Sequence, residues 1–217
     1  MTRIVAGLAG GTRLVTPPGA ATRPTSERVR EALFARLDHE GVLPGARVLD
    51  LYAGSGALGL EAASRGAAHV VLVDAAPRAL VAARRNAQQV RAAAGASARG
   101  EPPIVDVRPG SVGAFLAGPG SQPFDVVFFD PPYDVPEDRL ASDLTALGAR
   151  GWLAAAAVVV VERSSRSPEP AWPQGLERTG ERRYGETRLW FAEAPSGPED
   201  PPGDPPGDQV TTGANDR

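Results

Sequence analysis

Residues 50–59 read Asp-Leu-Tyr-Ala-Gly-Ser-Gly-Ala-Leu-Gly and predict a glycine-rich turn between a strand and a helix. The apolar run Ala46 to Leu49 precedes this turn and is typical of a short buried strand. Good helix formers follow the turn from Ala57 onward. Glycine lets the backbone approach a ligand closely, and the start of a helix directs free N–H groups toward an anionic part of that ligand. The pattern also fits a tight turn without a ligand, but we expect a nucleotide-type cofactor site at Gly54, Gly56 and Gly59.

Two acidic residues near this turn indicate the kind of cofactor. The next apolar run, residues 69–73, ends in Asp74, where a carboxylate is placed to accept both hydroxyls of a ribose. Asp50 stands four residues before Gly54, and in a dinucleotide fold it would face a pyrophosphate. A cofactor that carries an amino-acid cation, as S-adenosylmethionine does, would instead be stabilised by this acid. The two acids therefore favour the methyl donor.

A second motif follows residues 124–129, which are nearly all apolar and read as a central parallel strand. Asp130-Pro131-Pro132-Tyr133 comes directly after them, at the carboxyl edge where α/β sheets bind ligands. The prolines fix the backbone, so that the Asp130 carboxylate and the Pro131 carbonyl can accept the two hydrogens of an exocyclic amine. Two such acceptors favour a pyramidal nitrogen with an exposed lone pair, and Tyr133 offers a flat face for base stacking. The alternative is a proline turn with a capping aspartate.

Apolar runs alternate with helical patterns along the chain, which predicts an α/β fold with a parallel sheet and helices on both of its faces. A surface insertion and a disordered tail are also expected, because residues 94–103 and the chain beyond Ala194 are rich in Pro and Gly. The expected strands are 46–49, 69–73, 104–108, 124–129 and 158–162; the expected helices lie near 57–63, 77–94, 114–116 and 138–147; the expected hairpins are 3–7 with 12–15 and 179–184 with 187–191.

A further helix is expected after Arg23-Pro24-Thr25-Ser26, with Thr25 or Ser26 as its N-cap. Arg28 and Arg30 fall largely outside the apolar stripe of this helix. They either contact RNA or belong to an ordinary solvated face, because exposed arginines are common. The stripe consists of Val29, Leu33, Phe34 and Leu37.

Length and composition limit the class of protein. A chain of 217 residues with 42% hydrophobic content can bury a full core and is expected to form one domain with appendages. No run of about 18 apolar residues predicts a membrane span, and the N-terminus lacks the apolar core of a signal peptide, so we expect a cytoplasmic protein. The absence of cysteine excludes disulfides and thiolate-bound metals, and only two histidines are present, so no metal site is expected.

The net charge of −3 is unevenly distributed. Residues 193–217 carry a local net charge of −5, which leaves +2 for residues 1–192. Residues 1–38 contain six arginines against three acids, a local +3. All 23 basic residues are arginine, whose guanidinium fork suits phosphate. The charge therefore permits an RNA partner.

Three stretches together resemble the bacterial 16S rRNA (guanine(966)-N2) methyltransferase family, namely the two motifs above and the run from Arg23 to Phe34. The resemblance extends from Arg3 to about Phe191. It implies a Rossmann-like class I methyltransferase with a seven-stranded, mostly parallel sheet whose last strand is antiparallel. It also implies S-adenosylmethionine as the methyl donor. The implied acceptor is the N2 amine of a guanine in 16S rRNA, possibly within a partly assembled 30S particle, and we expect a monomer.

Motifs and resemblance together define the expected domains and site. Residues 1–40 are expected to form a hairpin and helix that bind RNA, 41–194 the methyltransferase core, and 195–217 a disordered acidic tail. Ser111 occupies a spot where the family commonly has Asn or Asp against the adenine, and the neutral stretch from Ala6 to Thr12 weakens the case for RNA contact by the N-terminal hairpin. The catalytic residues are expected to be Asp130, Pro131, Pro132 and Tyr133; the cofactor-binding residues Asp50, Tyr52, Ala53, Gly54, Ser55, Gly56, Gly59, Asp74, Ala75 and Ser111; and the RNA-binding residues Arg13, Arg23, Thr25, Arg28 and Arg30.

Three other functions were weighed. An adenine-N6 methyltransferase shares the Asp-Pro-Pro-Tyr motif, but on DNA it needs a target-recognition domain for which no segment is long enough. A non-catalytic module that binds S-adenosylmethionine would be expected to have lost that motif. A nicotinamide enzyme would account for the glycines, but it leaves Asp50 and the two prolines unexplained.

Overall fold

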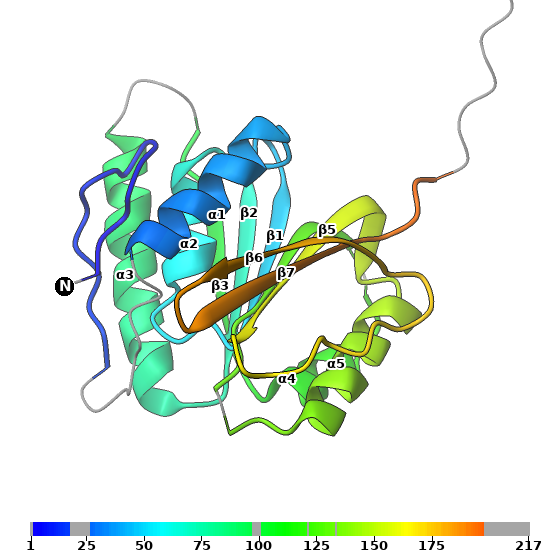
Figure 1. The fold of residues 1–217 in the computed structure, drawn as a ribbon. Coiled ribbons are helices and arrows are strands. Elements are labelled where there is room, and N and C mark those ends of the chain that lie inside the picture. The colour runs from blue at the N-terminus through cyan, green and yellow to red at the C-terminus, as the bar shows by residue number, and fades with distance from the viewer. Residues whose placement is uncertain (1, 18–26, 97–100, 121, 133, 198–217) are drawn as a thin grey trace, which may run out of the picture.

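A seven-stranded sheet forms the centre of the molecule, with strand order β3-β2-β1-β4-β5-β7-β6 (Figure 1). The structure is a computed structural model that describes residues 2–17, 27–96, 101–120, 122–132 and 134–197. Its strands are β1 (Arg47–Leu51), β2 (His69–Asp74), β3 (Ile104–Pro109), β4 (Phe124–Phe129), β5 (Leu153–Ser164), β6 (Glu177–Tyr184) and β7 (Thr187–Glu193). Its helices are α1 (Glu27–His39), α2 (Ala57–Ser64), α3 (Pro77–Gly95), α4 (Val112–Leu116) and α5 (Glu137–Ala149).

The strand directions confirm the expected fold class. Each neighbouring pair from β3 to β5 is parallel. The last strand, β7, is antiparallel to both of its neighbours, β5 and β6. The sheet is therefore mostly parallel with an antiparallel last strand, as in class I methyltransferases. β1 and β4 lie side by side in the sheet although β2 and β3 separate them in sequence. The order in which the strands are added to the sheet therefore reverses between β1 and β4.

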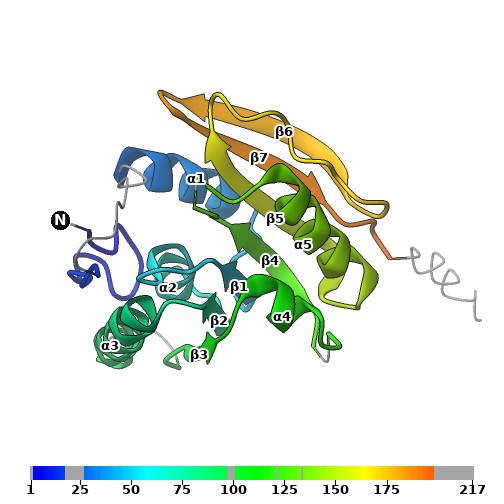
Figure 2. The same cartoon turned by 90° about the horizontal axis from the view of Figure 1, so that it is seen from below.

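Helices cover both faces of the sheet, which explains why its central strands are apolar throughout. Figure 2 shows α1, α2 and α3 on one side and α4 and α5 on the other. The buried side chains accordingly form two hydrophobic clusters, one on each face. In β4, Val126 and Phe128 belong to the first cluster, whereas Val127 and Phe129 belong to the second. Alternate residues of one strand thus pack on opposite faces.

Most predicted elements lie within one or two residues of those observed, but β5 is much longer than expected. The prediction began at Val158, whereas the strand begins at Leu153. Four consecutive alanines, residues 154–157, carry little strand preference and hid this extension. Ala156 has a φ of 55°, and the register with β4 shifts in this region, so the first part of β5 is irregular.

The N-terminal segment packs on the core. The predicted hairpin is present as an antiparallel chain reversal with a bridge between Arg3 and Arg13. Glu61 of α2 is fully buried and accepts hydrogen bonds from the backbone N–H groups of Val5, at 2.6 Å, and Ala6, at 3.1 Å. Ile4 and Leu14 also join the same hydrophobic cluster as α1 and α2. The extension and the core therefore share one interior.

Some predictions fall outside the described residues. These include the N-cap at Thr25 or Ser26, most of the acidic tail, and part of the insertion at 94–103. Among the described helices, none is long and apolar enough to cross a bilayer.

Candidate active site

The glycine turn connects β1 to α2 and requires glycine at specific positions. Gly54 and Gly56 have φ values of 57° and 81°, a left-handed conformation that favours glycine. Gly59 is required for another reason, because a Cβ there would lie 2.5 Å from Cδ2 of Leu72. The N–H of Gly56 donates to the Ala53 carbonyl at 2.7 Å, which closes the turn. The sequence therefore builds a tight loop whose backbone lies close against β2.

Asp50 lies beneath this turn. Its side chain is only 1% exposed, and its Oδ2 accepts a hydrogen bond from the N–H of Gly59 at 2.8 Å. The N-cap of α2 is Gly56, which has no side chain to cap the helix, so Asp50 supplies an acceptor for a first-turn N–H. Burial raises the pKa of this carboxyl to about 8, against the lowering effect of the Gly59 hydrogen bond. The carboxyl group therefore supports the loop from below, and its predicted role toward a cofactor cation stays a prediction.

Asp74 ends β2 and joins the glycine turn to that strand. Its Oδ2 accepts from the N–H of Gly54 and its Oδ1 from the N–H of Ala76, each at 2.8 Å. Each carboxylate oxygen retains a further lone pair, and the residue is only half-buried. The neighbouring Ala75 is exposed. Contact with a ribose thus stays a prediction that this geometry permits.

The side chain of Tyr52 points toward α5. Tyr52 has a φ of 62°, and its hydroxyl donates to Oδ2 of Asp143 at 2.7 Å. Burial, together with the hydrogen bond to Asp143, raises the pKa of the tyrosine hydroxyl. Arg139 also pairs with Asp143, at 3.2 Å. Asp143 was missed by sequence reasoning, although it lies between Leu140 and Leu144 on the buried side of the helix. The hydroxyl of Tyr52 is therefore used within the protein, and the contact between Tyr52 and the cofactor stays a prediction that its backbone could satisfy.

Asn86 of α3 is a second residue that the sequence did not reveal. It is fully buried, and its amide nitrogen donates to the carbonyls of Ser55 and Val15, each at 2.9 Å. Its Oδ1 accepts from the N–H of Val15 at 2.8 Å. One side chain thereby fixes both the glycine turn and the N-terminal segment.

The Asp-Pro-Pro motif lies beside the glycine turn. β4 and β1 are parallel neighbours with Phe129 opposite Leu51, so both loops leave the same edge of the sheet. Asp130 and Pro131 are half-buried and buried, respectively, whereas Tyr133 lies outside the described residues. The negative charges of Asp130 and Asp74 each contribute to the raised pKa of Asp50. Asp74 and Asp130 thus place two acidic side chains at this edge, near the buried Asp50, and their negative charge suits a cationic ligand.

Ser111 lies after β3, at the far side of β2 from the glycine turn, and caps α4. Its Oγ accepts a hydrogen bond from the N–H of Ala114 at 3.3 Å. The serine is exposed, so the predicted contact with an adenine stays a prediction.

The arginines predicted to bind RNA differ in their exposure to solvent. Arg13 is exposed and lines an open cavity of about 270 Å³ with Arg3, Gly11 and Glu27. Arg28 is exposed, but Arg30 is only 2% exposed, so the two do not share a solvated face. The side chain of Arg30 turns inward, where the charge of Glu61 acts on it, and we no longer expect it to contact RNA from the surface. Arg23 and Thr25 lie outside the described residues.

Known proteins match this chain over nearly its whole length. A family model described as Conserved hypothetical protein 95 matches residues 2–193. Ribosomal RNA small subunit methyltransferase D of Escherichia coli (strain K12) is 34% identical over 194 residues, which are 88% of this chain and 90% of the relative. The solved structure of yhhF from Escherichia coli has a TM-score of 0.75 and 30% identity, over 90% of this chain and 99% of that chain. Magnesium protoporphyrin IX methyltransferase from Synechocystis PCC 6803, solved with bound SAM, shares the fold alone, with a TM-score of 0.58 at 19% identity over 77% of this chain and 79% of that chain.

Proposed function

Since this chain belongs to the family of ribosomal RNA small subunit methyltransferase D, we propose that it methylates the exocyclic N2 amine of a guanine in 16S rRNA, with S-adenosylmethionine as the donor. One observation carries the proposal. The glycine turn after β1 and the Asp130-Pro131-Pro132 loop after β4 leave neighbouring parallel strands at the same edge. A donor and an acceptor held by these two loops would lie side by side.

The residues at this edge fit a cationic methyl donor. S-adenosylmethionine carries a sulfonium and an ammonium group and, when bound, supplies an activated methyl group. Asp74 and Asp130 provide negative charge at the surface of the site, and Asp50 lies beneath the turn. Asp74 would accept the ribose hydroxyls with the lone pairs that its two backbone hydrogen bonds leave. The turn from Ala53 to Gly56 would contact the donor through its backbone.

The Asp-Pro-Pro loop would bind the amine that receives the methyl group. The lone pair of an exocyclic amine is delocalised into its ring, so the nitrogen is a weak nucleophile. The Asp130 carboxylate and the Pro131 carbonyl would accept its two hydrogens and turn the lone pair toward the methyl group. Asp130 acts as an acceptor of a hydrogen bond, and Tyr133 would stack on the base. The proton leaves the nitrogen only after transfer is advanced, so no strong base is needed.

The N-terminal segment would bind the RNA backbone. Arg3 and Arg13 lie opposite each other on antiparallel segments and line one cavity, although Glu27 pairs with Arg3 at 3.3 Å. Two adjacent guanidinium groups suit a phosphate, and Arg28 would add an exposed contact nearby in sequence. We propose further that the enzyme is a cytoplasmic monomer, that a 30S precursor is its substrate, and that residues 195–217 are dispensable.

Nucleoside analysis tests this function directly. Purified protein and S-adenosylmethionine are incubated with 16S rRNA or with 30S particles from a strain that lacks the enzyme. Mass spectrometry of the digested RNA should show N2-methylguanosine, and the Asp130→Asn variant should produce much less. N6-methyladenosine as the product would overturn the choice of base, whereas failure to methylate either substrate would refute the proposal as a whole.

A further inference from the structure

Arg163 is a buried charged residue near the Asp-Pro-Pro loop to which no role has yet been given. It lies close to the end of β5 and is only 3% exposed. Its Nη2 donates to the backbone carbonyl of Val135 at 3.1 Å and to the carboxylate of Glu137. Val135 belongs to the segment that follows Pro132, and Glu137 is the first residue of α5. Arg163 therefore joins β5 to the chain that leaves the proposed amine site.

Keeping an arginine at this position is unfavourable for stability. Its Nε and Nη1 are buried and have no hydrogen-bond partner among the described residues. Arg188 lies directly opposite on β7, and like charges in opposite positions of an antiparallel pair destabilise a sheet. Replacing a buried ion pair with apolar residues of similar size is often neutral or stabilising. The contacts that Nη2 of Arg163 makes with Val135 and Glu137 are thus the feature to be explained.

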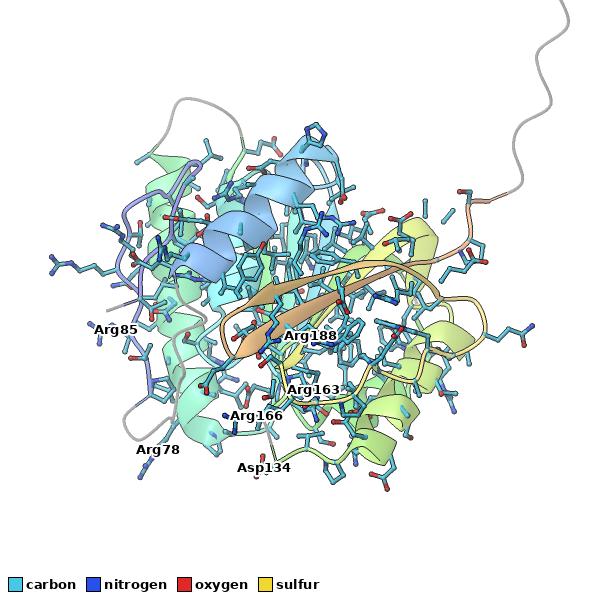
Figure 3. All side chains as sticks on the ribbon, viewed as in Figure 1. Arg78, Arg85, Asp134, Arg163, Arg166 and Arg188 are labelled. Carbon is cyan, nitrogen blue, oxygen red and sulfur yellow. The ribbon has the colours of Figure 1, made fainter. Side chains whose placement is uncertain are left out.

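Those contacts fix the far end of the segment that begins at Asp130. At its start, the N–H of Asp130 donates to the carbonyl of Leu51 at 3.4 Å, a long hydrogen bond. Farther along, the N–H of Val135 donates to the carbonyl of Pro132 at 3.0 Å within the segment itself. Arg163 supplies the connection to a neighbouring strand at the far end. Figure 3 shows Arg163 at the same end of the molecule as Asp134, with Arg166 and Arg188 close by.

We propose that Arg163 is a positioning residue for methyl transfer, which holds the loop that carries Asp130 and Pro131 in its reactive geometry. This inference rests on the proposed function. The guanidinium touches neither the donor nor the amine; it acts through the backbone of Val135 and the start of α5. Methyl transfer needs the nitrogen about 3–3.5 Å from the methyl carbon, and a displacement of about 1 Å can slow such a step by about a hundredfold. Loss of this clamp should therefore reduce the rate of transfer more than it reduces binding.

Four variants separate positioning from folding. Arg163→Lys keeps the charge, but its side chain ends one bond short of the position of Nη2, the atom that reaches both acceptors. Glu137→Ala breaks the same ion pair from a side chain that is 40% exposed, so the buried position stays filled. Glu137→Gln keeps an oxygen acceptor and should partly rescue the rate. Arg166→Lys is the matched control, because Arg166 lies three residues farther on, is 86% exposed and pairs with Glu186 instead.

Three measurements are made on each variant with the full-length protein. Single-turnover methylation of 16S rRNA with saturating S-adenosylmethionine should slow roughly tenfold to a hundredfold in Arg163→Lys and Glu137→Ala. Calorimetry should give an unchanged affinity for S-adenosylmethionine. Hydrogen exchange should become faster for the amides of residues 134–140, while those of β4 and β5 stay protected. The Arg166→Lys control should match the wild type in all three.

Two results would overturn the inference. One is a wild-type rate in both Arg163→Lys and Glu137→Ala. The other is a fall in three quantities together: the affinity for S-adenosylmethionine, the protection from hydrogen exchange throughout the sheet, and the rate of methyl transfer. That result would make Arg163 a general structural residue. If the wild type itself methylates no RNA, the proposed function fails, and hydrogen exchange at residues 134–140 still decides whether the clamp exists.

Discussion

Replacing Asn86 with alanine should weaken the glycine turn and the N-terminal segment together. The amide of Asn86 makes three hydrogen bonds to backbone groups of two separate segments. The variant would leave the N–H and carbonyl of Val15 and the carbonyl of Ser55 without these partners. A buried polar group that loses its partner costs about 1–3 kcal/mol, and water can reach these part-buried groups in the variant. Three such groups would cost about 3–9 kcal/mol if fully buried, and because water reaches them we expect a smaller loss, roughly 2–4 kcal/mol in the free energy of unfolding.

Urea denaturation measures this loss, and calorimetry with S-adenosylmethionine measures its effect on the turn. Affinity for the cofactor should fall as well, because Ser55 lies in the loop that is proposed to bind it. Gln89→Ala is the matched control, since Gln89 is exposed on the same helix and its replacement should change stability by less than about 0.5 kcal/mol. Asn86→Asp keeps the acceptor for the N–H of Val15 and should lose an intermediate amount. If Asn86→Ala is as stable as Gln89→Ala, the hydrogen bonds to Val15 and Ser55 contribute nothing, and our account of the N-terminal segment is refuted.

Three other predictions concern pH, chemistry and RNA. Burial raises the pKa of Asp50 from 3.8 to about 8, so between these pH values the folded protein retains a proton that the unfolded chain has lost. The free energy of unfolding should therefore fall as the pH rises from 5 to 8, by at most about 1.4 kcal/mol per pH unit, when it is compared with that of the Asp50→Asn variant. Parallel stability curves for the two proteins would contradict this. Asp130→Asn should slow single-turnover methylation roughly tenfold to a hundredfold and leave cofactor affinity unchanged, since a charged acceptor is replaced by a weaker neutral one. Arg13→Ala should weaken RNA binding and lower the salt dependence by roughly one phosphate contact, whereas Arg91→Ala, an exposed change on α3, should do neither.

The sequence predicted the elements whose signals are local. β4 was predicted with its observed bounds, because its apolar residues are enclosed by Pro123 and Asp130. The start of α2 was likewise predicted, because the glycine-rich stretch ends and good helix formers begin at Ala57. The beginning of β5 was not, because its four alanines carry little strand preference and fall where the register with β4 shifts, between Leu153 and Val158. The hairpin of β6 and β7 was predicted from residue patterns, whereas the antiparallel pairing of β7 with β5 came from the family resemblance.

Side-chain orientation within a helix was predicted less well. Arg30 was placed outside the apolar stripe of α1, but it is buried, and the charge of Glu61 on a different helix partly offsets the cost of its desolvation. Helical periodicity assigns a polar residue to the outside by default. It cannot anticipate an acid that is 31 positions away in the chain and reaches the same interior.

The residues that sequence reasoning missed share one property, and it explains how this site is built. Glu61, Asn86 and Arg163 are all buried, and each binds backbone groups of a loop or terminal segment. The glycine and proline motifs show where a ligand should meet the backbone, because those residues are needed for the shape of each loop. They do not show what keeps the loops in place, since the supporting side chains come from other strands and helices. A polar residue inside an otherwise apolar stripe, such as Asp143 between Leu140 and Leu144, is the signal that could have found them. It marks a position where a buried side chain is needed to satisfy a group on another segment, and here those segments form the edge where the chemistry is proposed to occur.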